Sequence, residues 1–220
     1  MPRLLYGGTF DPVHLGHLAI AGAVADAYRD PVFLIPAADP PHRPPPGASA
    51  EQRAEMLELA AQGDPRLRVD RRELHRDGPS YTVDTLAEVR AQLGPAVSII
   101  WVMGIDSLQQ LDTWHDWKRL FRIAHVLGVE RPSGPVDPAW LLKHAPVVAA
   151  EVAARQCDPA QLAQSPAGGY AALPLRPLRP ESATLVRSRI RHGGDWRSLV
   201  PESVAAYIQQ TGLYQPASSG

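Results

Sequence analysis

Short apolar runs alternate along this chain with longer stretches that have helical spacing. Runs bounded by turn-forming residues are typical of strands covered on both faces of a parallel sheet, and they lie at residues 4–6, 31–36, 97–104 and 125–129. A shorter alternating run at 67–70 predicts a strand near an edge. Helical spacing lies between the runs, at residues 18–28, 49–61, 80–93 and 117–123. This alternation predicts an α/β fold, a doubly wound parallel sheet with right-handed crossovers and helices on both faces.

The last third of the chain has a less regular pattern. Prolines and an alanine-rich stretch within 131–180 predict one or two short helices and a sixth strand at 170–173, and we treat this region as an insertion without assigned chemistry. Hydroxyl side chains followed by arginines predict a further helix at 182–191. The last helix is expected to begin at Pro201, in the favoured first position, and to end at Gly212.

The junction between the first strand and the first helix carries the most informative stretch, GGTFDPVHLGH at residues 7–17. Gly7 and Gly8 let the backbone approach a ligand without a Cβ in the way, and the new helix offers unpaired N–H groups to an anion. His14 and His17 are three residues apart and therefore share one face of the helix start. Each of these residues alone is common in turns and at helix ends, but together they favour a phosphate site.

Composition narrows the class of partner. The chain has 220 residues, enough for a single core, and we expect one domain over 1–214 followed by a flexible tail at 215–220. A formal net charge of −1 gives no basic surface for a nucleic acid. Cys157 is the only cysteine, which excludes an internal disulfide and suits a reducing compartment. No apolar run approaches the roughly 20 residues that span a bilayer, so we expect a cytoplasmic protein.

Two further loops follow predicted strands on the side where such sheets bind ligands. The proline-rich loop at 37–46 carries Arg43, a candidate phosphate contact, although proline-rich loops also serve as plain spacers. Gly104 ends the strand at 97–104, and Asp106 lies just beyond it. The sequence shows no cluster of carboxylates for a metal ion, so a metal would arrive with its substrate.

The stretch 7–17, GGTFDPxHxGH, resembles the signature of the nucleotidyltransferase superfamily, and Ser182-x-Thr184-x-x-Arg187 resembles its second signature. The segments 80–86 (SYTVDTL) and 104–117, with Trp114 and Trp117, are similar to the nicotinate-nucleotide adenylyltransferase family. The resemblance covers about 1–131 and 182–214. It implies a Rossmann-like nucleotidyltransferase fold with a small C-terminal helical part, and an enzyme of NAD biosynthesis that uses ATP and nicotinate mononucleotide and releases deamido-NAD and pyrophosphate.

The resemblance also implies roles for individual residues. His14, His17 and Arg187 would be catalytic, with His17 steadying the α-phosphate. Thr85 would contact the nicotinate carboxylate and Trp117 would stack on the pyridine ring, although two tryptophans three apart are also common in a helix core. The ATP-binding residues would be Gly7, Gly8, Thr9, Phe10, Arg43, Gly104, Asp106, Ser182 and Thr184, with the Asp106 carboxylate accepting a hydrogen bond from a ribose hydroxyl. Mg²⁺ would be carried in with ATP.

Two positions depart from the family pattern, and rival functions remain open. Arg43 stands where the family has lysine, which changes a point charge to a planar fork, and Glu181 stands where it has isoleucine. The alternatives are transfer to nicotinamide mononucleotide, transfer to phosphopantetheine, and a nucleotide sensor without turnover. Neither a nucleic acid nor a membrane partner is expected, and the sequence leaves a homo-oligomer open.

Overall fold

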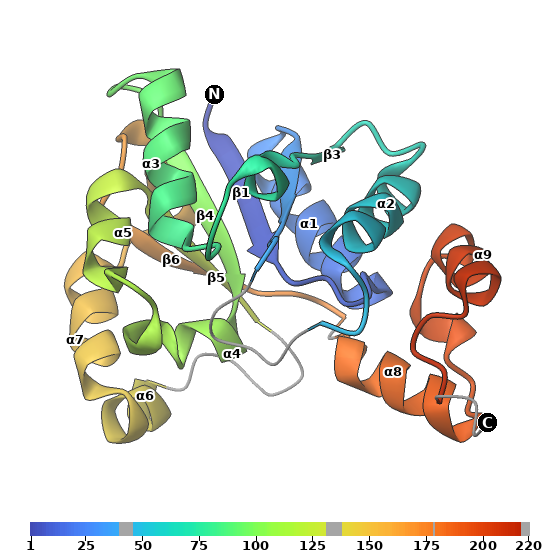
Figure 1. The fold of residues 1–220 in the computed structure, drawn as a ribbon. Helices are drawn as coiled ribbons and strands as arrows, with labels where there is room; N and C mark the ends of the chain where they lie inside the picture. Colours follow the sequence, from blue (N-terminus) through green and yellow to red (C-terminus); the bar gives the residue numbers. More distant parts are fainter. Residues whose placement is uncertain (40–45, 131–137, 178, 217–220) are drawn as a thin grey trace.

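A six-stranded, entirely parallel sheet forms the centre of the molecule, with strand order β3-β2-β1-β4-β5-β6 (Figure 1). We describe the computed structural model of residues 1–220, leaving out 40–45, 131–137, 178 and 217–220. The strands are β1 (Arg3–Gly8), β2 (Val32–Pro36), β3 (Leu67–Val69), β4 (Ile99–Gly104), β5 (His125–Val129) and β6 (Tyr170–Leu173). The doubly wound sheet predicted from the apolar runs, including its sixth strand, is therefore confirmed.

Helices connect the strands and cover both faces of the sheet. The α-helices are α1 (Leu15–Tyr28), α2 (Ala50–Ala61), α3 (Thr82–Leu93), α4 (Ile105–Leu108), α5 (Trp117–Ile123), α6 (Pro138–His144), α7 (Pro146–Arg155), α8 (Ala183–His192) and α9 (Glu202–Thr211). The 3₁₀ turns are η1 (Arg72–His75), η2 (Leu111–Thr113), η3 (Pro159–Gln164) and η4 (Arg197–Leu199). In the region 131–180, the described part contains two short α-helices, as predicted.

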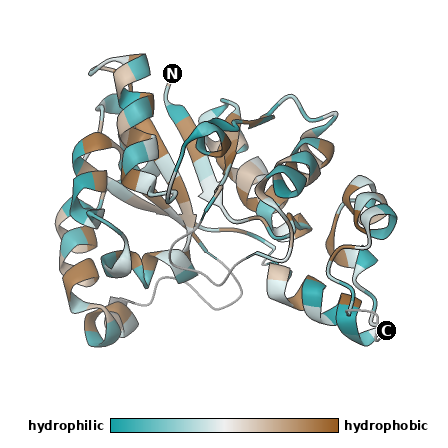
Figure 2. Cartoon of the chain, in the orientation of Figure 1, coloured by the Kyte–Doolittle hydropathy of each residue, from teal (hydrophilic) through white to brown (hydrophobic). Residues whose placement is uncertain are grey.

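Alternate residues of the central strands pack into two separate cores. Leu4 and Tyr6 of β1 face the core beneath α1, α2 and the C-terminal helices, whereas Leu5 faces the core beneath α3, α5 and α7. The strands are mostly apolar or pale in Figure 2, while polar residues lie on the outer sides of the helices. This two-residue period is what a sheet covered on both faces requires.

The C-terminal helices complete the first of these cores. Val186 of α8 and Val204 and Ile208 of α9 are buried in it, and α9 packs beside α2, where the Ser203 hydroxyl donates to the Leu59 carbonyl at 3.1 Å. At the start of α9 the prediction was one residue early, because Pro201 is the N-cap and Glu202 the first helical residue.

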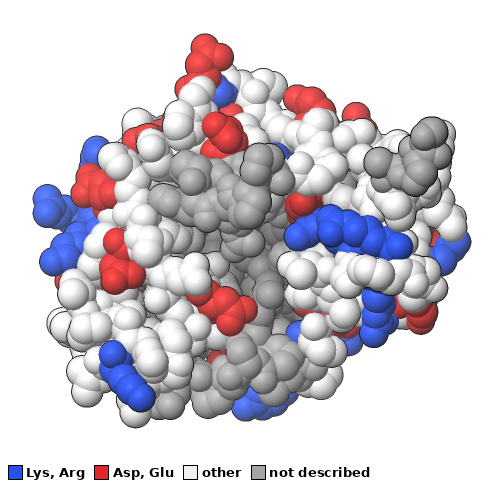
Figure 3. All heavy atoms as spheres, turned by 60° about the horizontal axis from the view of Figure 1, so that its bottom comes forward, with Lys and Arg blue, Asp and Glu red and all other residues white. Residues whose placement is uncertain are grey.

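On the face at the bottom of Figure 1, turned forward in Figure 3, Lys and Arg side chains lie interspersed with Asp and Glu side chains among the described residues. This agrees with the near-neutral formal charge of −1. No helix within the described ranges is long and apolar enough to cross a membrane.

Candidate active site

The candidate site lies where the strand order changes direction. From β1 the chain runs outward through β2 and β3 and then returns to β4 on the other side of β1. In open parallel sheets, ligands bind at the carboxyl ends of the two strands that flank such a switch point. These ends carry the Gly7-Gly8 turn of β1 and Gly104 of β4, so the two sequence motifs are brought to neighbouring positions.

His14 is the N-cap of α1 and His17 lies one turn into the helix. Their rings are stacked, with centroids 3.7 Å apart and planes inclined by 28°. His17 also packs edge-on against Phe10, at 4.9 Å between ring centroids. The prediction that both histidines share the helix start is confirmed, and Phe10 fixes the orientation of the His17 ring.

The hydrogen bonding of His17 determines which of its ring nitrogens carries a proton. The backbone N–H of His14 donates to Nδ1 of His17, with 3.3 Å between the nitrogens. A ring nitrogen that accepts a hydrogen bond carries no proton, so in the neutral ring the N–H is at Nε2. His17 thus presents a donor suited to a phosphate oxygen.

Gly7 is required by close packing beneath the loop. A Cβ at this position would lie 2.2 Å from Cη2 of Trp101, a buried residue of β4. Because the Trp101 ring fills this space, the first glycine of the motif has a packing role.

Phe10, two residues past the second glycine, has a φ of 50° and is 2 % exposed.

Arg53 of α2 was not identified from the sequence, although it hydrogen-bonds the loop between β1 and α1 (residues 9–14), which we call the phosphate loop after its predicted role. Its side chain is buried, and it donates to the carbonyl of Thr9 at 2.7 Å, of Ala38 at 3.1 Å and of Ala48 at 3.3 Å. Burial lowers the pKa of the guanidinium, and the charge of nearby Asp11 opposes this shift. An arginine in an amphipathic helix gives no sequence signal of such a role.

The start of α8 approaches the same loop from the C-terminal part of the chain. Ser182 is the N-cap of α8, as predicted, and its hydroxyl accepts from the Leu185 N–H at 3.1 Å. Thr184 is exposed in the first turn. Arg187 reaches the β1–α1 loop, where its Nη1 donates to the Asp11 carbonyl and lies 3.6 Å from the Asp11 Oδ2. Ser182, Thr184 and Arg187 therefore lie together at the start of α8, and the arginine contacts the β1–α1 loop.

Glu181, which replaces an apolar residue of the family pattern, is buried and pairs with Arg179 at 3.3 Å. A Cβ on Gly16 would lie 3.2 Å from the Glu181 carbonyl. The buried Glu181 carboxylate is therefore paired with the guanidinium of a residue two positions earlier.

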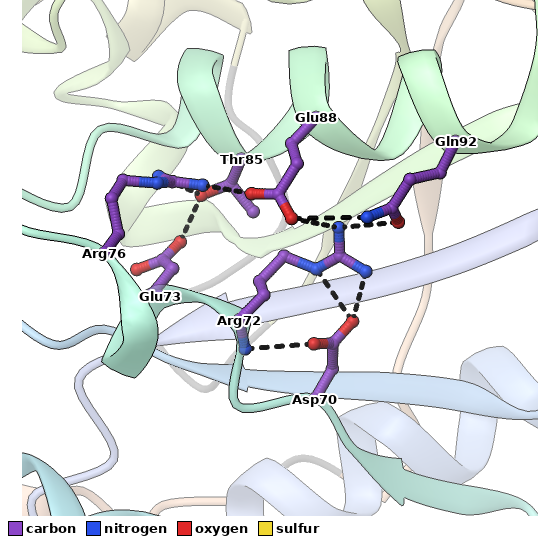
Figure 4. Close-up of polar contacts among 7 residues, drawn as sticks. All are labelled: Asp70, Arg72, Glu73, Arg76, Thr85, Glu88 and Gln92. Atoms are coloured by element: carbon purple, nitrogen blue, oxygen red, sulfur yellow. Dashed lines mark hydrogen bonds and ion pairs between the residues drawn. The ribbon is translucent and has the colours of Figure 1, made fainter.

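Thr85 belongs to a polar network between α3 and η1, which Figure 4 shows. Its hydroxyl is fully buried, donates to the Glu73 carboxylate at 2.6 Å and accepts from Arg76 at 3.2 Å. Arg76 also donates to Glu88, and Arg72 links Glu88 to the Asp70 carboxylate. For the Thr85 hydroxyl to donate to a ligand, it would have to give up its hydrogen bond to the Glu73 carboxylate.

Aromatic side chains gather at the start of α3 and of α5. Tyr81, the N-cap of α3, stacks on His115 with ring centroids 4.3 Å apart. Trp117 is the first residue of α5 and is half-buried, with the Lys118 amine 5.6 Å from its ring. Trp114 lies before this helix, at the end of η2. The stacking role of Trp117 stays a prediction, and the nearby Tyr81–His115 pair was not predicted.

The remaining predicted residues follow β4 and β2. Gly104 is the N-cap of α4, and Asp106 is exposed in its first turn, so the predicted contact to a ribose hydroxyl stays a prediction. Arg43 lies outside the described residues. Across the described ranges, no three His, Cys, Asp or Glu side chains are grouped so that they could hold a metal ion.

The fold and the site define a Rossmann-like nucleotidyltransferase. Residues 5–189 match the family model described as cytidylyltransferase-like. In structure, the chain is similar to a Plasmodium falciparum nicotinic acid mononucleotide adenylyltransferase complexed with NaAD, with a TM-score of 0.73, 15 % identity and coverage of 97 % and 98 % of the two chains. The same enzyme complexed with APC gives a TM-score of 0.70 at 15 % identity, covering 97 % and 96 %.

Comparison with curated sequences is more specific. A protein of Stenotrophomonas maltophilia (strain K279a) named "Probable nicotinate-nucleotide adenylyltransferase" is 48 % identical over 219 residues, covering 97 % of this chain and 96 % of the relative. One of the same name from Xylella fastidiosa (strain M12) is 45 % identical over 220 residues, covering 97 % of each. The chain belongs to the nicotinate-nucleotide adenylyltransferase family.

Proposed function

We propose that this protein transfers AMP from ATP to nicotinate mononucleotide, giving deamido-NAD and pyrophosphate in NAD biosynthesis. The observation that carries the proposal is the stacked His14–His17 pair at the start of α1, beside the Gly7-Gly8 turn of the switch point. The family relationship supplies the substrates, which are those named for its relatives.

In the proposed reaction, a phosphate oxygen of the mononucleotide attacks the α-phosphorus of ATP. A new P–O bond forms as the bond between the α-phosphorus and the bridging oxygen breaks, and that electron pair leaves with pyrophosphate. No covalent enzyme intermediate is needed, because such transfers depend mainly on positioning and on neutralising charge. Nε2–H of His17 donates to the α-phosphate, and Arg187, Ser182 and Thr184 hold the β- and γ-phosphates.

The other proposed contacts are those that the family resemblance implies. Gly7, Gly8, Thr9 and Phe10 form the turn against which the nucleotide lies, and Gly104 and Asp106 take the ribose. Arg43 contributes a phosphate contact in place of the family lysine. Thr85 and Trp117 select and stack the nicotinate ring. Mg²⁺ would be carried in with ATP and would neutralise part of the phosphate charge.

Pyrophosphate release, measured with ATP and either nicotinate or nicotinamide mononucleotide, tests the proposal. We expect turnover with nicotinate mononucleotide and a lower kcat/KM with the amide. Turnover only with nicotinamide mononucleotide, or with phosphopantetheine, would assign the activity of another nucleotidyltransferase to this chain. If ATP binds but no pyrophosphate is released with any acceptor, the chain is a nucleotide sensor and the proposal is wrong.

We place the reaction in the cytoplasm, consistent with a chain that has one cysteine, Cys157.

A further inference from the structure

The Asp11 carboxylate lies where three parts of the chain meet. It is 6 % exposed. Its oxygens accept from the N–H of Gly47 at 2.8 Å and of Ala48 at 3.1 Å, and from the Tyr214 hydroxyl at 2.8 Å. Asp11 belongs to the phosphate loop, whereas Tyr214 follows α9 and lies 203 residues later. A buried hydrogen bond therefore ties the phosphate loop directly to the C-terminal segment.

Arg187 uses the same aspartate as its counter-ion. Its Nη1 donates to the Asp11 carbonyl and lies 3.6 Å from Oδ2. The Arg187 side chain is 25 % exposed, while that of Asp11 is 8 % exposed. The guanidinium thus pairs with a buried anion of the protein, while part of the Arg187 side chain is open to solvent and could meet a phosphate. When it binds a phosphate, its attraction to Asp11 is weakened.

A buried carboxylate that loses its counter-ion must be compensated by other groups, because an unpaired buried charge is costly. Among the described residues, two of the remaining donors are backbone N–H groups, and the third is the Tyr214 hydroxyl. The positive charge of buried Arg53 also acts on Asp11 and Tyr214. Within the described ranges, Tyr214 is therefore the side chain that hydrogen-bonds the Asp11 carboxylate and has no proposed contact with the nucleotide.

Tyr214 is well suited to donate at this position. Burial and the adjacent Asp11 raise the pKa of its hydroxyl far above the ordinary value, so the group stays protonated. The ring packs directly against the backbone of Gly47, where an added Cβ would lie 2.9 Å from its Cδ1. The same Cβ would lie 3.8 Å from Cδ of Arg187. Tyr214, Gly47 and Arg187 thus form one packed group around Asp11.

We propose that Tyr214 is a positioning residue for ATP: its hydrogen bond to Asp11 compensates the buried carboxylate and so frees Arg187 to bind the triphosphate. This inference rests on the proposed function, since it assigns the triphosphate to Arg187. It assigns Tyr214 to the ATP half of the site and gives it no contact with the second substrate.

The test is calorimetric binding of Mg-ATP and, separately, of nicotinate mononucleotide to the full chain. Tyr214→Phe should raise the Kd for ATP about tenfold, the effect of one charge-assisted hydrogen bond, and leave the Kd for the mononucleotide unchanged. Tyr207→Phe is the matched control, because Tyr207 lies on α9 and its hydroxyl donates to Glu55 at the exposed surface. An unchanged ATP affinity in Tyr214→Phe, or equal losses for both ligands, would overturn the inference.

A double-mutant cycle separates this role from a general effect on folding. In an Arg187→Ala background, Tyr214→Phe should cause no further loss of ATP affinity, whereas additive losses would contradict the coupling. If Tyr214→Phe does not fold, Gly47→Ala displaces the same ring without removing a hydroxyl, and the same ATP-specific loss is expected. Wild-type protein that binds no ATP would overturn the proposed function itself, whereas wild-type binding with an unaffected variant overturns only the role of Tyr214.

Discussion

His17 is held by contacts on two sides of its ring. Its Nδ1 accepts the N–H of His14, and Phe10 packs against the ring edge-on. These contacts fix both the tautomer and the direction of Nε2–H before a ligand arrives. A donor fixed in advance loses little entropy when charge develops on a phosphate, which is how such groups stabilise transition states.

Replacing His17 by Ala should therefore lower kcat by about 10²–10⁴-fold with little change in the melting temperature. His192→Ala is the matched control, since His192 is exposed at the end of α8 and contacts only the carbonyl of Ser188 among the bonds described. Steady-state pyrophosphate release measures both variants. Near-normal turnover of His17→Ala would exclude the proposed role.

Arg53 acts on stability rather than directly on chemistry. Replacing it by Met leaves the buried carbonyls of Thr9, Ala38 and Ala48 without this donor, so the free energy of unfolding should fall by about 3 kcal/mol or more. Arg66→Met is the comparison, because Arg66 makes its ion pairs at the exposed surface, and such pairs contribute little. Urea unfolding followed by circular dichroism would measure both, and equal effects would contradict the structural role of Arg53.

At the scale of the elements, the junction of η1 and α3 shows how a local rule is overridden. The sequence favours Ser80 or Thr82 as the cap of α3, but the N-cap is Tyr81 and it makes no side-chain cap. The Ser80 hydroxyl instead accepts from the N–H groups of Ala38 and Asp39, in the loop after β2. The Ser80 hydroxyl, which the sequence predicts as a cap of α3, instead joins the segment before α3 to the loop after β2.

Glu73 in η1 should make stability depend on pH. Burial raises its pKa above the ordinary 4.5, and hydrogen bonds from Thr85 and Ser80 oppose the shift only in part. A raised folded-state pKa means that the carboxyl's contribution to stability is complete below 4.5 and is lost as pH rises through the folded value. Relative to Glu73→Gln, the wild type should lose free energy of unfolding as the pH rises above 4.5 and through the folded-state pKa. A constant difference across this range would show that Glu73 does not titrate in this way.

Thr85 in α3 is tested by the choice of substrate. Thr85→Val should lower kcat/KM for nicotinate mononucleotide more than for its amide, whereas Thr85→Ser, which keeps the hydroxyl, should preserve the ratio. The ratio is the useful measurement because the hydroxyl also supports Glu73 and Arg76, and a loss of packing affects both substrates alike. Equal losses for the two substrates would contradict the carboxylate contact.

At the scale of the whole molecule, the features that could be predicted from the sequence are those formed by residues close together in the chain. The strands, the Gly7-to-His17 turn and the Ser182 helix start are continuous stretches, and the structure has each where it was expected. Arg53 and Tyr214 were not identified, because their partners lie 44 and 203 residues away in the sequence. Helical periodicity places Arg53 on α2 but does not reveal which carbonyls meet its guanidinium.

The hydrogen bond between Asp11 and Tyr214 also determines when, during synthesis of the chain, the candidate site can be completed. The phosphate loop is synthesised first, and the Asp11 carboxylate can bond the Tyr214 hydroxyl only after 203 further residues have been added. At about 5–20 residues per second, the interval is on the order of 10–40 seconds. Contacts of such long sequence separation form slowly because the intervening chain must first be ordered. A growing chain therefore carries an incomplete nucleotide site until nearly all of this sequence has been made.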